Sequence, residues 1–223
     1  DGFTLAELVV SQVSGMSYIR FLQEYITNLA NAPSTCSGGN IDKNLSHIRK
    51  SGEPYEYLMH IGPGGVINDL TDCAKVGTLF IDPKGVFKTG ILDETTRPQG
   101  KSFIPSFTCE NYGLGWDCVN YANNVYDFGE NTLVKDGGTI SFGSYLLVSK
   151  KHNLSASVSL TFDNKVDHQA LLCDLCAMLL DEYGLNIRRS KKEALKTNKT
   201  LVANEYSEKF SGFYYNNYEI LRV

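Results

Sequence analysis

Apolar residues recur at steps of three and four along the first part of the chain. This spacing is that of one face of an α-helix, in which about 3.6 residues complete a turn. The stripe consists of Leu5, Leu8, Val9, Val13, Met16, Ile19, Leu22, Ile26 and Leu29. Thr4 and Glu7 have the spacing of a capping box, and Asn31 provides a stop. The pattern predicts a long N-terminal helix within residues 1–31, with Gly15 as the place for a kink.

The character of the chain changes over residues 55–163, where short runs are rich in β-branched and aromatic residues. Such runs between glycine- or proline-containing turns are typical of strands in local hairpins. The runs cover residues 55–61, 76–81, 86–92, 139–149 and 155–162, with turns at Pro63-Gly64-Gly65, Asp82-Pro83-Lys84-Gly85, Asp136-Gly137-Gly138 and residues 150–154. Because the alternation of strands and helices found in parallel sheets is not visible, we expect an antiparallel sheet.

Two further segments complete the expected elements. Apolar residues over 166–184 predict a second helix that stops at Gly184. Tyrosines and aliphatic residues over 212–223 predict a final strand. Since no linker or repeat separates these elements, we expect one α+β domain over residues 1–223, in which the N-terminal helix packs on an antiparallel sheet and the second helix lies near the C-terminus.

The composition narrows the class of protein. A hydrophobic content of 42% with 11% aromatic residues is enough for a packed core and argues against disorder. The net charge of −4 comes without a basic stripe, which argues against a nucleic-acid partner. No apolar run reaches the roughly 18 residues of a transmembrane helix, so we expect no membrane span in this chain. No spacing of His, Cys, Asp or Glu indicates a metal site, and no cofactor is expected.

The six cysteines form an even set, which suits three disulfide bonds in an exported protein. They are Cys36, Cys73, Cys109, Cys118, Cys173 and Cys176. Spacing alone does not determine how they pair. Cys173 and Cys176 lie mid-helix among leucines, where cysteines behave as small buried apolar groups, and one or both could bridge to Cys36 or Cys73. We therefore expect an extracellular or cell-surface location.

The first residues carry a resemblance to a known family. The run from Gly2 to Val10 resembles the start of type IV pilins and pseudopilins, in which a peptidase cuts after a glycine and the new N-terminus is often Phe. The resemblance implies processing at Gly2 and Phe3, and it implies that Glu7 neutralises the terminal amine of a neighbouring subunit. It covers about nine residues, and polar residues beyond them replace the apolar anchor of that family. The alternative is an ordinary amphipathic helix.

Cys118 has a second interpretation. It follows a glycine-rich loop and precedes a short helical stretch, and this segment resembles the nucleophile segment of NlpC/P60 and CHAP peptidases. The resemblance implies Cys118 as nucleophile and His152 as base, with His168 or Asn164 to orient the base. A disulfide between Cys109 and Cys118, across the intervening loop, is the interpretation that we favour.

These observations favour an exported, non-enzymatic surface or secreted protein of structural or adhesive type, with a pilin-like filament subunit as its most specific form. The expected partners are a second copy of the chain or another surface protein. Two alternatives stay open. One is a cysteine hydrolase, and the other is a glycan- or ligand-binding module suggested by the run Tyr214-Tyr215-Asn216-Asn217-Tyr218.

Overall fold

The structure is a computed structural model that describes residues 2–37, 60–88, 90–101, 111–123, 125–139, 142–161, 166–188, 213–215 and 220–222. The chain divides into two compact units, Asp1–Arg188 and Arg189–Val223. In the second unit, β8 (Phe213–Tyr215) and β9 (Ile220–Arg222) pair antiparallel. The described part of residues 212–223 is thus a pair of short strands rather than the single strand expected.

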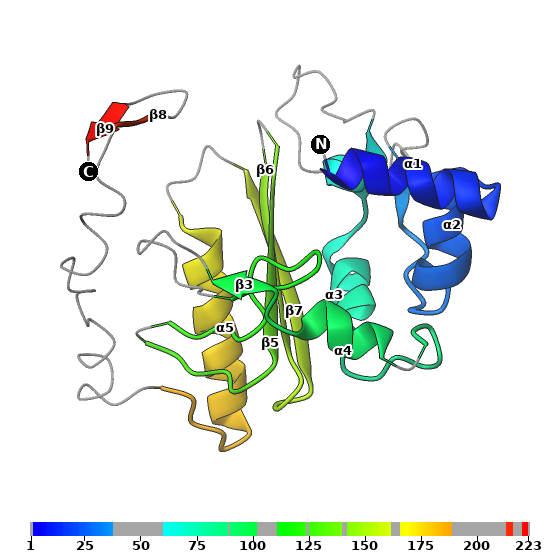
Figure 1. Ribbon diagram of the computed structural model, residues 1–223. Coiled ribbons are helices and arrows are strands. Elements are labelled where there is room, and N and C mark those ends of the chain that lie inside the picture. Colours follow the sequence, from blue (N-terminus) through cyan, green and yellow to red (C-terminus); the bar gives the residue numbers. More distant parts are fainter. Residues whose placement is uncertain are drawn as a thin grey trace. The chain divides into compact units, whose positions relative to one another are not determined.

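A three-stranded antiparallel sheet forms the centre of the first unit (Figure 1). Its strands are β5 (Thr132–Gly138), β6 (Phe142–Ser149) and β7 (Leu154–Thr161), in that order across the sheet. A tight turn in which Asn153 takes a positive φ of 50° joins β6 to β7. The antiparallel sheet, its last two strands and their hairpin confirm the prediction. Strand β5 was not predicted, because Asp136-Gly137-Gly138 has the composition of a turn, yet forms the end of this strand.

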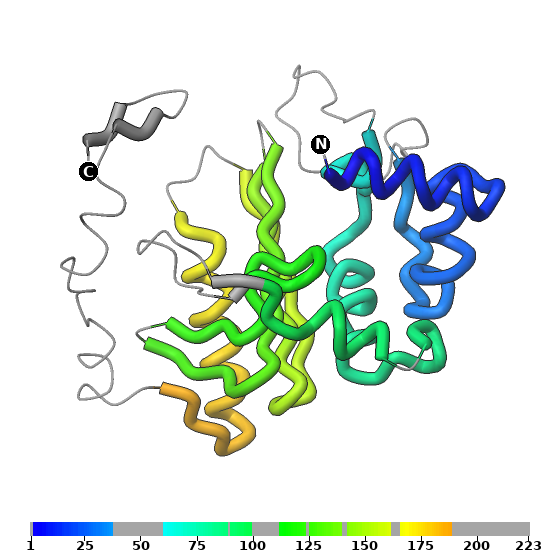
Figure 2. Tube along the Cα trace, viewed as in Figure 1, coloured from blue at the N-terminus to red at the C-terminus, as the bar shows by residue number. Residues whose placement is uncertain are grey.

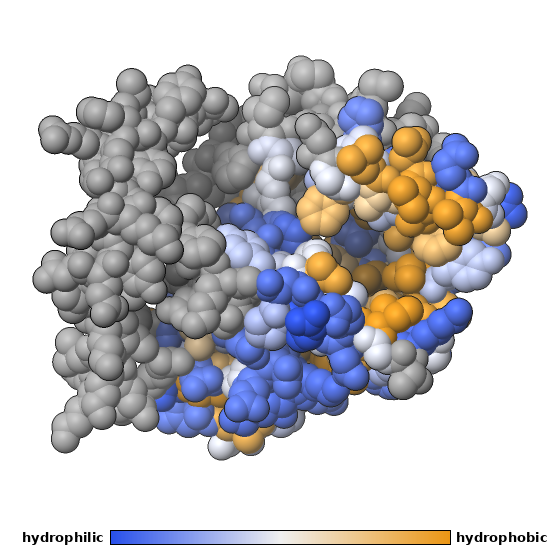
Figure 3. Space-filling model, viewed as in Figure 1, coloured by the Kyte–Doolittle hydropathy of each residue, from blue (hydrophilic) through white to orange (hydrophobic). Residues whose placement is uncertain are grey.

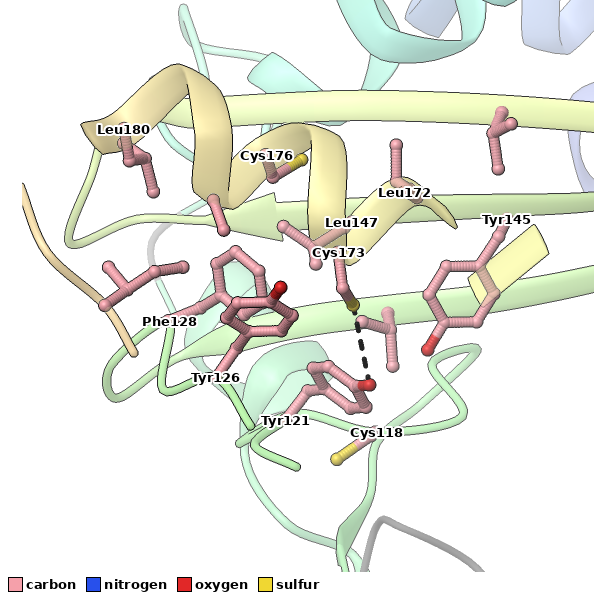
Figure 4. Packing of buried hydrophobic residues seen from close by; sticks show 14 residues of the cluster. Cys118, Tyr121, Tyr126, Phe128, Tyr145, Leu147, Leu172, Cys173, Cys176 and Leu180 are labelled. Carbon is pink, nitrogen blue, oxygen red and sulfur yellow. Dashed lines mark hydrogen bonds between the residues drawn. The ribbon is translucent and has the colours of Figure 1, made fainter. Parts of the chain in front are cut away.

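Helix α5 (His168–Glu182) covers one face of this sheet, and it confirms the predicted second helix. Asp167 caps it by accepting hydrogen bonds from the backbone N–H groups of Gln169 and Ala170. Its inner face packs on sheet residues to form the main core (Figure 4). The buried residues of this face are Leu172, Cys173, Cys176, Ala177 and Leu180. At the other end, Gly184 has a φ of 74°, the left-handed conformation that ends a helix readily.

Helix α3 (Leu70–Thr78) packs on the opposite face, so that two segments far apart in sequence enclose the sheet (Figure 2). Two serines of β7 form hydrogen bonds to α3. The hydroxyl of Ser155 donates to the carbonyl of Ala74 and that of Ser157 to the carbonyl of Leu70, each at 2.7 Å. The approach is so close that a Cβ atom on Gly77 would lie 2.2 Å from the hydroxyl of Ser155. This glycine is therefore required by packing.

The strand predicted over residues 76–81 is wrong, because this segment contains the end of α3 and the turn after it. An apolar run of this length fits a strand or a buried helix equally well. The helix prevails because Asp69 caps its start and accepts from the N–H of Asp72 at 2.8 Å. The turn at residues 82–85 consequently follows a helix and joins no hairpin. The run over 86–92 likewise contains the start of α4 (Ile91–Thr96) and no strand among its described residues.

The N-terminal helix is divided into three pieces: α1 (Gly2–Ser14), α2 (Tyr18–Leu22) and the π-helical turn η1 (Gln23–Thr27). Gly15, with a φ of 68°, makes the break, so the kink was predicted correctly and the single long helix was not. Helix α1 contacts α2 and a second π-helical turn, η4 (Ile61–Gly65).

The apolar stripe of α1 faces outward, contrary to its predicted packing on the sheet (Figure 3). Its exposed side chains include Phe3, Leu5, Leu8, Val9 and Val13, at 53%, 64%, 59%, 60% and 85% of their full accessibility. The inward side carries Glu7, whose carboxylate accepts from the N–H of Gly62 at 2.8 Å. Since α1 begins at Gly2, Thr4 lies within the helix and the predicted capping box does not form.

Two short antiparallel pairs complete the described structure: β1 (Cys36–Ser37) with β2 (Val66–Ile67), and β3 (Gly100–Lys101) with β4 (Asn111–Tyr112). Within the described ranges, no helix combines the length and the apolar character needed to cross a bilayer.

Candidate functional site

Strand β5 lies at the edge of the central sheet, and part of its free edge is covered by a neighbouring segment. Val134 forms a bridge to Cys118: its N–H donates to the carbonyl of Cys118 at 2.9 Å, and its carbonyl accepts from Asp117 at 3.0 Å. The N–H of Tyr121 donates to the carbonyl of Thr132 at 2.9 Å. The first half of β5 is therefore paired on both sides.

The second half of β5 has an open edge. In an antiparallel sheet the peptide groups of alternate residues point to opposite sides of the strand. The N–H and C=O groups of Val134 point away from β6. Those of Asp136 and Gly138, two and four residues further on, therefore point away from β6 too. The N–H of Asp136 donates to the carboxylate of Asp117 at 2.6 Å. The N–H and C=O of Gly138 point to the same side, where the described part of the chain supplies no hydrogen-bond partner.

A cleft of about 350 Å³ lies beside this end of β5. Its lining comes from three places: the strand itself, the segment that covers its edge, and the start of α5. The lining residues are Tyr112, Asp117, Cys118, Tyr121, Val134, Lys135, Asp136, Gly137, Gly138, Tyr145, Asp167, His168 and Gln169. The cleft thus combines an open strand edge with charged groups and tyrosines, and its volume is near the lower end of the roughly 300–1,000 Å³ found for ligand pockets.

Asp117 organises the charged groups of this cleft. Its carboxylate lies 2.9 Å from the ammonium of Lys135 and accepts the N–H of Asp136 with the same oxygen, Oδ2. Lys135 also donates to the backbone carbonyl of Asp136. The two side chains of this ion pair are 41% and 40% exposed, so solvent screens their attraction. The backbone bond to Asp136 is the stronger constraint, because it fixes the strand where its edge opens.

Asp136 connects the strand to α5. Its Oδ1 lies 3.1 Å from Nε2 of His168, the first residue of that helix. The imidazole meets the ring of Tyr145 edge to face, with centroids 6.0 Å apart. The carboxylate of Asp136 is 61% exposed, whereas His168 is 23% exposed. Asp136 therefore presents a carboxylate to the cleft, and His168 holds it from behind.

Tyr121 lines the inner wall of the cleft and joins it to the core (Figure 4). Its hydroxyl accepts from the amide groups of Gln169 at 2.7 Å and Asn123 at 3.1 Å, and it lies 3.6 Å from the sulfur of Cys173. Burial raises the pKa of Tyr121 and also that of Tyr145. Both phenols stay neutral at physiological pH, so they offer hydrogen bonds rather than charge.

The structure brings together only part of the predicted catalytic set. Cys118 and His168 both line the cleft, but His152 does not. His152 lies in the hairpin between β6 and β7, where burial lowers the pKa of its imidazole. The sulfur of Cys118 is in a disulfide bond. Since a disulfide has no thiolate, the cysteine-hydrolase interpretation has no nucleophile at this position. Cys109 and Asn164 lie outside the described residues.

The expected framework of three disulfides needs correction, because Cys73, Cys173 and Cys176 are free thiols. Cys173 and Cys176 face the sheet from the inner side of α5, where they fill space among apolar side chains. Burial raises the pKa of Cys173 to about 11 and that of Cys176 to about 12. Thiols that stay protonated in this way act as small apolar groups, as the sequence predicted.

The sequence interpretation missed Lys135, Asp136 and Gly138 as cleft residues. Their signal was present in Asp136-Gly137-Gly138, which we interpreted as a turn. Asp117 was equally overlooked, because its partner Asp136 lies 19 positions further along the chain. Nothing in local spacing shows that the two residues meet.

Comparison with known proteins identifies a fold but no family. No family model matches the chain, and no curated protein matches it. Among solved structures, SurE with D-Leu is similar, with a TM-score of 0.52 and 13% identity over 85% of this chain and 44% of SurE. A β-lactamase from Sulfitobacter sp. EE-36 is similar with a TM-score of 0.58 and 17% identity, over 82% of this chain and 58% of the other.

A weaker similarity, with a TM-score of 0.47 and 12% identity, is to the D-amino acid amidase from Ochrobactrum anthropi SV3 complexed with D-phenylalanine; it covers 72% of this chain and 49% of the amidase. The chain spans about half the length of these solved structures. At such low identity the first two similarities concern the fold alone.

Proposed function

We propose that the cleft beside β5 binds an extended, peptide-like ligand, which adds to the open edge of the sheet as a further strand. The observation that carries this proposal is the outward N–H and C=O of Gly138, at the rim of a cleft of about 350 Å³. Strand addition uses such a pair, since a ligand's amide both donates and accepts. Gly137 and Gly138 have no side chains to keep a ligand backbone away.

The fold comparison supports this choice of ligand class. One similar structure contains D-Leu, which is an amino acid, and the other is named for β-lactams, which are cyclic amides. Short peptides of D- and L-amino acids are therefore the first probes to use.

The proposal is for binding rather than for a reaction. Among the described residues that line the cleft, Cys118 is the only serine, threonine or cysteine, and its sulfur is in a disulfide. The buried tyrosines have raised pKa values and give no phenolate near neutral pH. We accordingly assign no catalytic step to the described residues of this cleft.

The test uses ligands that differ by one methyl group. Acetylated D-Ala-D-Ala and L-Ala-L-Ala amides would be titrated by calorimetry and by NMR, beside versions in which each backbone nitrogen in turn is methylated. Methylation of the amide that pairs with Gly138 removes one hydrogen bond and blocks close approach, so affinity should fall about tenfold. If every methylated peptide binds as tightly as its parent, strand addition is not the mode of binding.

A second candidate function is self-association through α1, and it carries forward the expected role of a surface or filament subunit with Gly2 and Phe3 at the assembly site, but without the predicted role of Glu7 there, because its carboxylate is bonded to Gly62. Its support is the exposed apolar face of α1 described above. By the exposed fractions, this face presents roughly 500 Å², near the upper end of the patches found on monomers. Glu7, the only charged residue of α1, is turned inward to Gly62, so two copies would meet without repulsion.

Two such faces would bury about 1,000 Å² in total, close to the lower limit for a specific interface. Sedimentation of the wild-type chain should therefore show a concentration-dependent dimer. Val9→Glu should abolish it, whereas Val125→Glu, at a site 52% exposed elsewhere in the chain, should not. A wild-type chain that stays monomeric up to about 100 µM, well above typical micromolar dissociation constants, would contradict this proposal.

A further inference from the structure

The charges that line the cleft beside β5 do not cancel. Three carboxylates (Asp117, Asp136 and Asp167) face one ammonium, that of Lys135. Among the described residues of the lining, these four groups therefore leave an excess of two negative charges. A concave surface with an excess of one sign attracts ligand groups of the opposite sign and repels groups of the same sign. This excess selects for positively charged ligands.

The three carboxylates differ in how far their acceptor capacity is used. Asp117 accepts from Lys135 with both oxygens and from the N–H of Asp136. Oδ1 of Asp167 accepts hydrogen bonds from the two N–H groups that it caps at the start of α5. At Asp136, Oδ1 is bonded to His168, and Oδ2 has no partner among the described residues. Oδ2 of Asp167 likewise has no partner among the described residues, but Asp136, with 61% of its side chain exposed, is the one of these two carboxylates that lies on the strand with the open edge.

The position of Asp136 relative to the open edge is also suitable. It precedes Gly138 by two residues on the same side of β5, a separation of roughly 7 Å along a strand. A ligand that pairs with Gly138 therefore carries its next groups past the carboxylate of Asp136. An ammonium one residue from the paired amide lies within reach of Oδ2.

We propose that this cleft recognises ligands that carry an ammonium group, with Asp136 as the residue that determines this specificity. The proposal rests on the binding of a peptide-like ligand proposed above, and adds its charge class. The ammonium can be a peptide's N-terminus or a lysine-type side chain, and both have the same chemistry. Lys135 does not offer a matching site for carboxylates, because Asp117 already neutralises it at 2.9 Å.

The experiment compares four dipeptides by calorimetry at constant pH and salt. These are D-Ala-D-Ala amide with a free amine, its acetylated neutral form, the acetylated form with a free carboxylate, and acetylated D-Lys-D-Ala amide. We expect the free amine to bind about tenfold more tightly than the neutral form, and the carboxylate more weakly than either. Tight binding of the lysine peptide would identify a side-chain ammonium as the group recognised; tight binding of the free amine alone would identify the N-terminus.

Two variants separate charge recognition from folding. Asp136→Asn keeps the shape of the side chain and should bring the affinity for the free amine down to that of the neutral peptide, whose own affinity should not change. Asp93→Asn removes one charge on α4, outside the cleft lining, and should leave the tenfold preference intact.

Equal binding of amine and neutral peptides by the wild type, or a preference that survives in Asp136→Asn, would overturn charge selection while strand addition still stands. A cleft that binds none of the four peptides would overturn both proposals. Circular dichroism of each variant checks that the fold is kept.

Discussion

The carboxylate of Asp117 accepts the backbone N–H of Asp136 at 2.6 Å, and this bond determines where the edge of the sheet opens. Before that point, the segment containing Asp117 pairs with β5 through backbone groups. After it, no described segment does so, and the glycines of the strand border the cleft. One side chain thus ends the pairing of a strand and leaves the next peptide group for a ligand.

Asp117→Ala should therefore destabilise the protein. It removes a charged acceptor from the N–H of Asp136 as well as an ion pair, and we expect the free energy of unfolding to fall by about 1–2 kcal/mol. Urea denaturation measures this loss. Lys135→Met removes the half-exposed ion pair and the exposed hydrogen bond from Lys135 to the carbonyl of Asp136, but keeps the bond from the N–H of Asp136 to Asp117, and should cost less than about 1 kcal/mol. Equal losses in the two variants would show that the backbone hydrogen bond contributes little.

Tyr121→Phe should cost about 1–2 kcal/mol although the change removes a single oxygen atom. The change removes the hydroxyl that accepts from the amide groups of Gln169 and Asn123 inside the protein. Tyr112→Phe serves as the control, since Tyr112 lines the same cleft but is 39% exposed. Thermal unfolding of both variants gives the comparison. A Tyr121→Phe protein as stable as the control would mean that water replaces the lost hydroxyl.

The thiols of Cys173 and Cys176 should be unreactive toward iodoacetamide in the native protein at pH 8. Burial raises their pKa values to about 11 and about 12, from the ordinary 9.0, so the thiolate is scarce. Mass spectrometry after alkylation, with and without denaturant, checks this expectation. Rapid native labelling of either cysteine would contradict its burial.

Cys118 should be labelled only after reduction, and labelling without reductant would contradict its disulfide.

The same two thiols make stability depend on pH. Because their folded pKa values lie above the unfolded ones, the unfolded chain loses its protons first as the pH rises. Their contribution is complete below about pH 9 and is lost as the pH rises through about 11 for Cys173 and about 12 for Cys176. Urea midpoints measured from pH 8 to pH 11 should therefore fall. Cys173→Ala with Cys176→Ala should flatten this part of the profile, and an unchanged slope would assign it to other groups.

Substitution on α1 distinguishes the two orientations of that helix. Leu8→Gln should change stability by no more than about 0.5 kcal/mol, because Leu8 is 59% exposed. Leu172→Ala, on the inner face of α5, should cost about 2–5 kcal/mol, because Leu172 is 3% exposed. Both are measured by urea denaturation at a protein concentration low enough to exclude dimers. A cost above about 2 kcal/mol for Leu8→Gln would place the stripe of α1 in the core after all.

Elements with local sequence signals were predicted correctly from the amino-acid sequence. Helix α5 has a cap at Asp167, a broad apolar arc and a left-handed glycine at its end, all within one segment. The hairpin of β6 and β7 is similarly specified by two apolar runs and the turn between them. These elements need little information from the rest of the chain, because capping, periodicity and turn geometry act over a few residues.

Tertiary structure decided everything that depends on which segments meet. Helix α3 lies on the sheet because two serines of β7 bind its carbonyls, and the stripe of α1 faces outward because Glu7 on the opposite side binds η4. The cleft joins Asp117 to Asp136 across 19 positions and Asp136 to His168 across 32. Contacts of this kind follow from strand register and the packing of helices on a sheet, which no local pattern of residues contains.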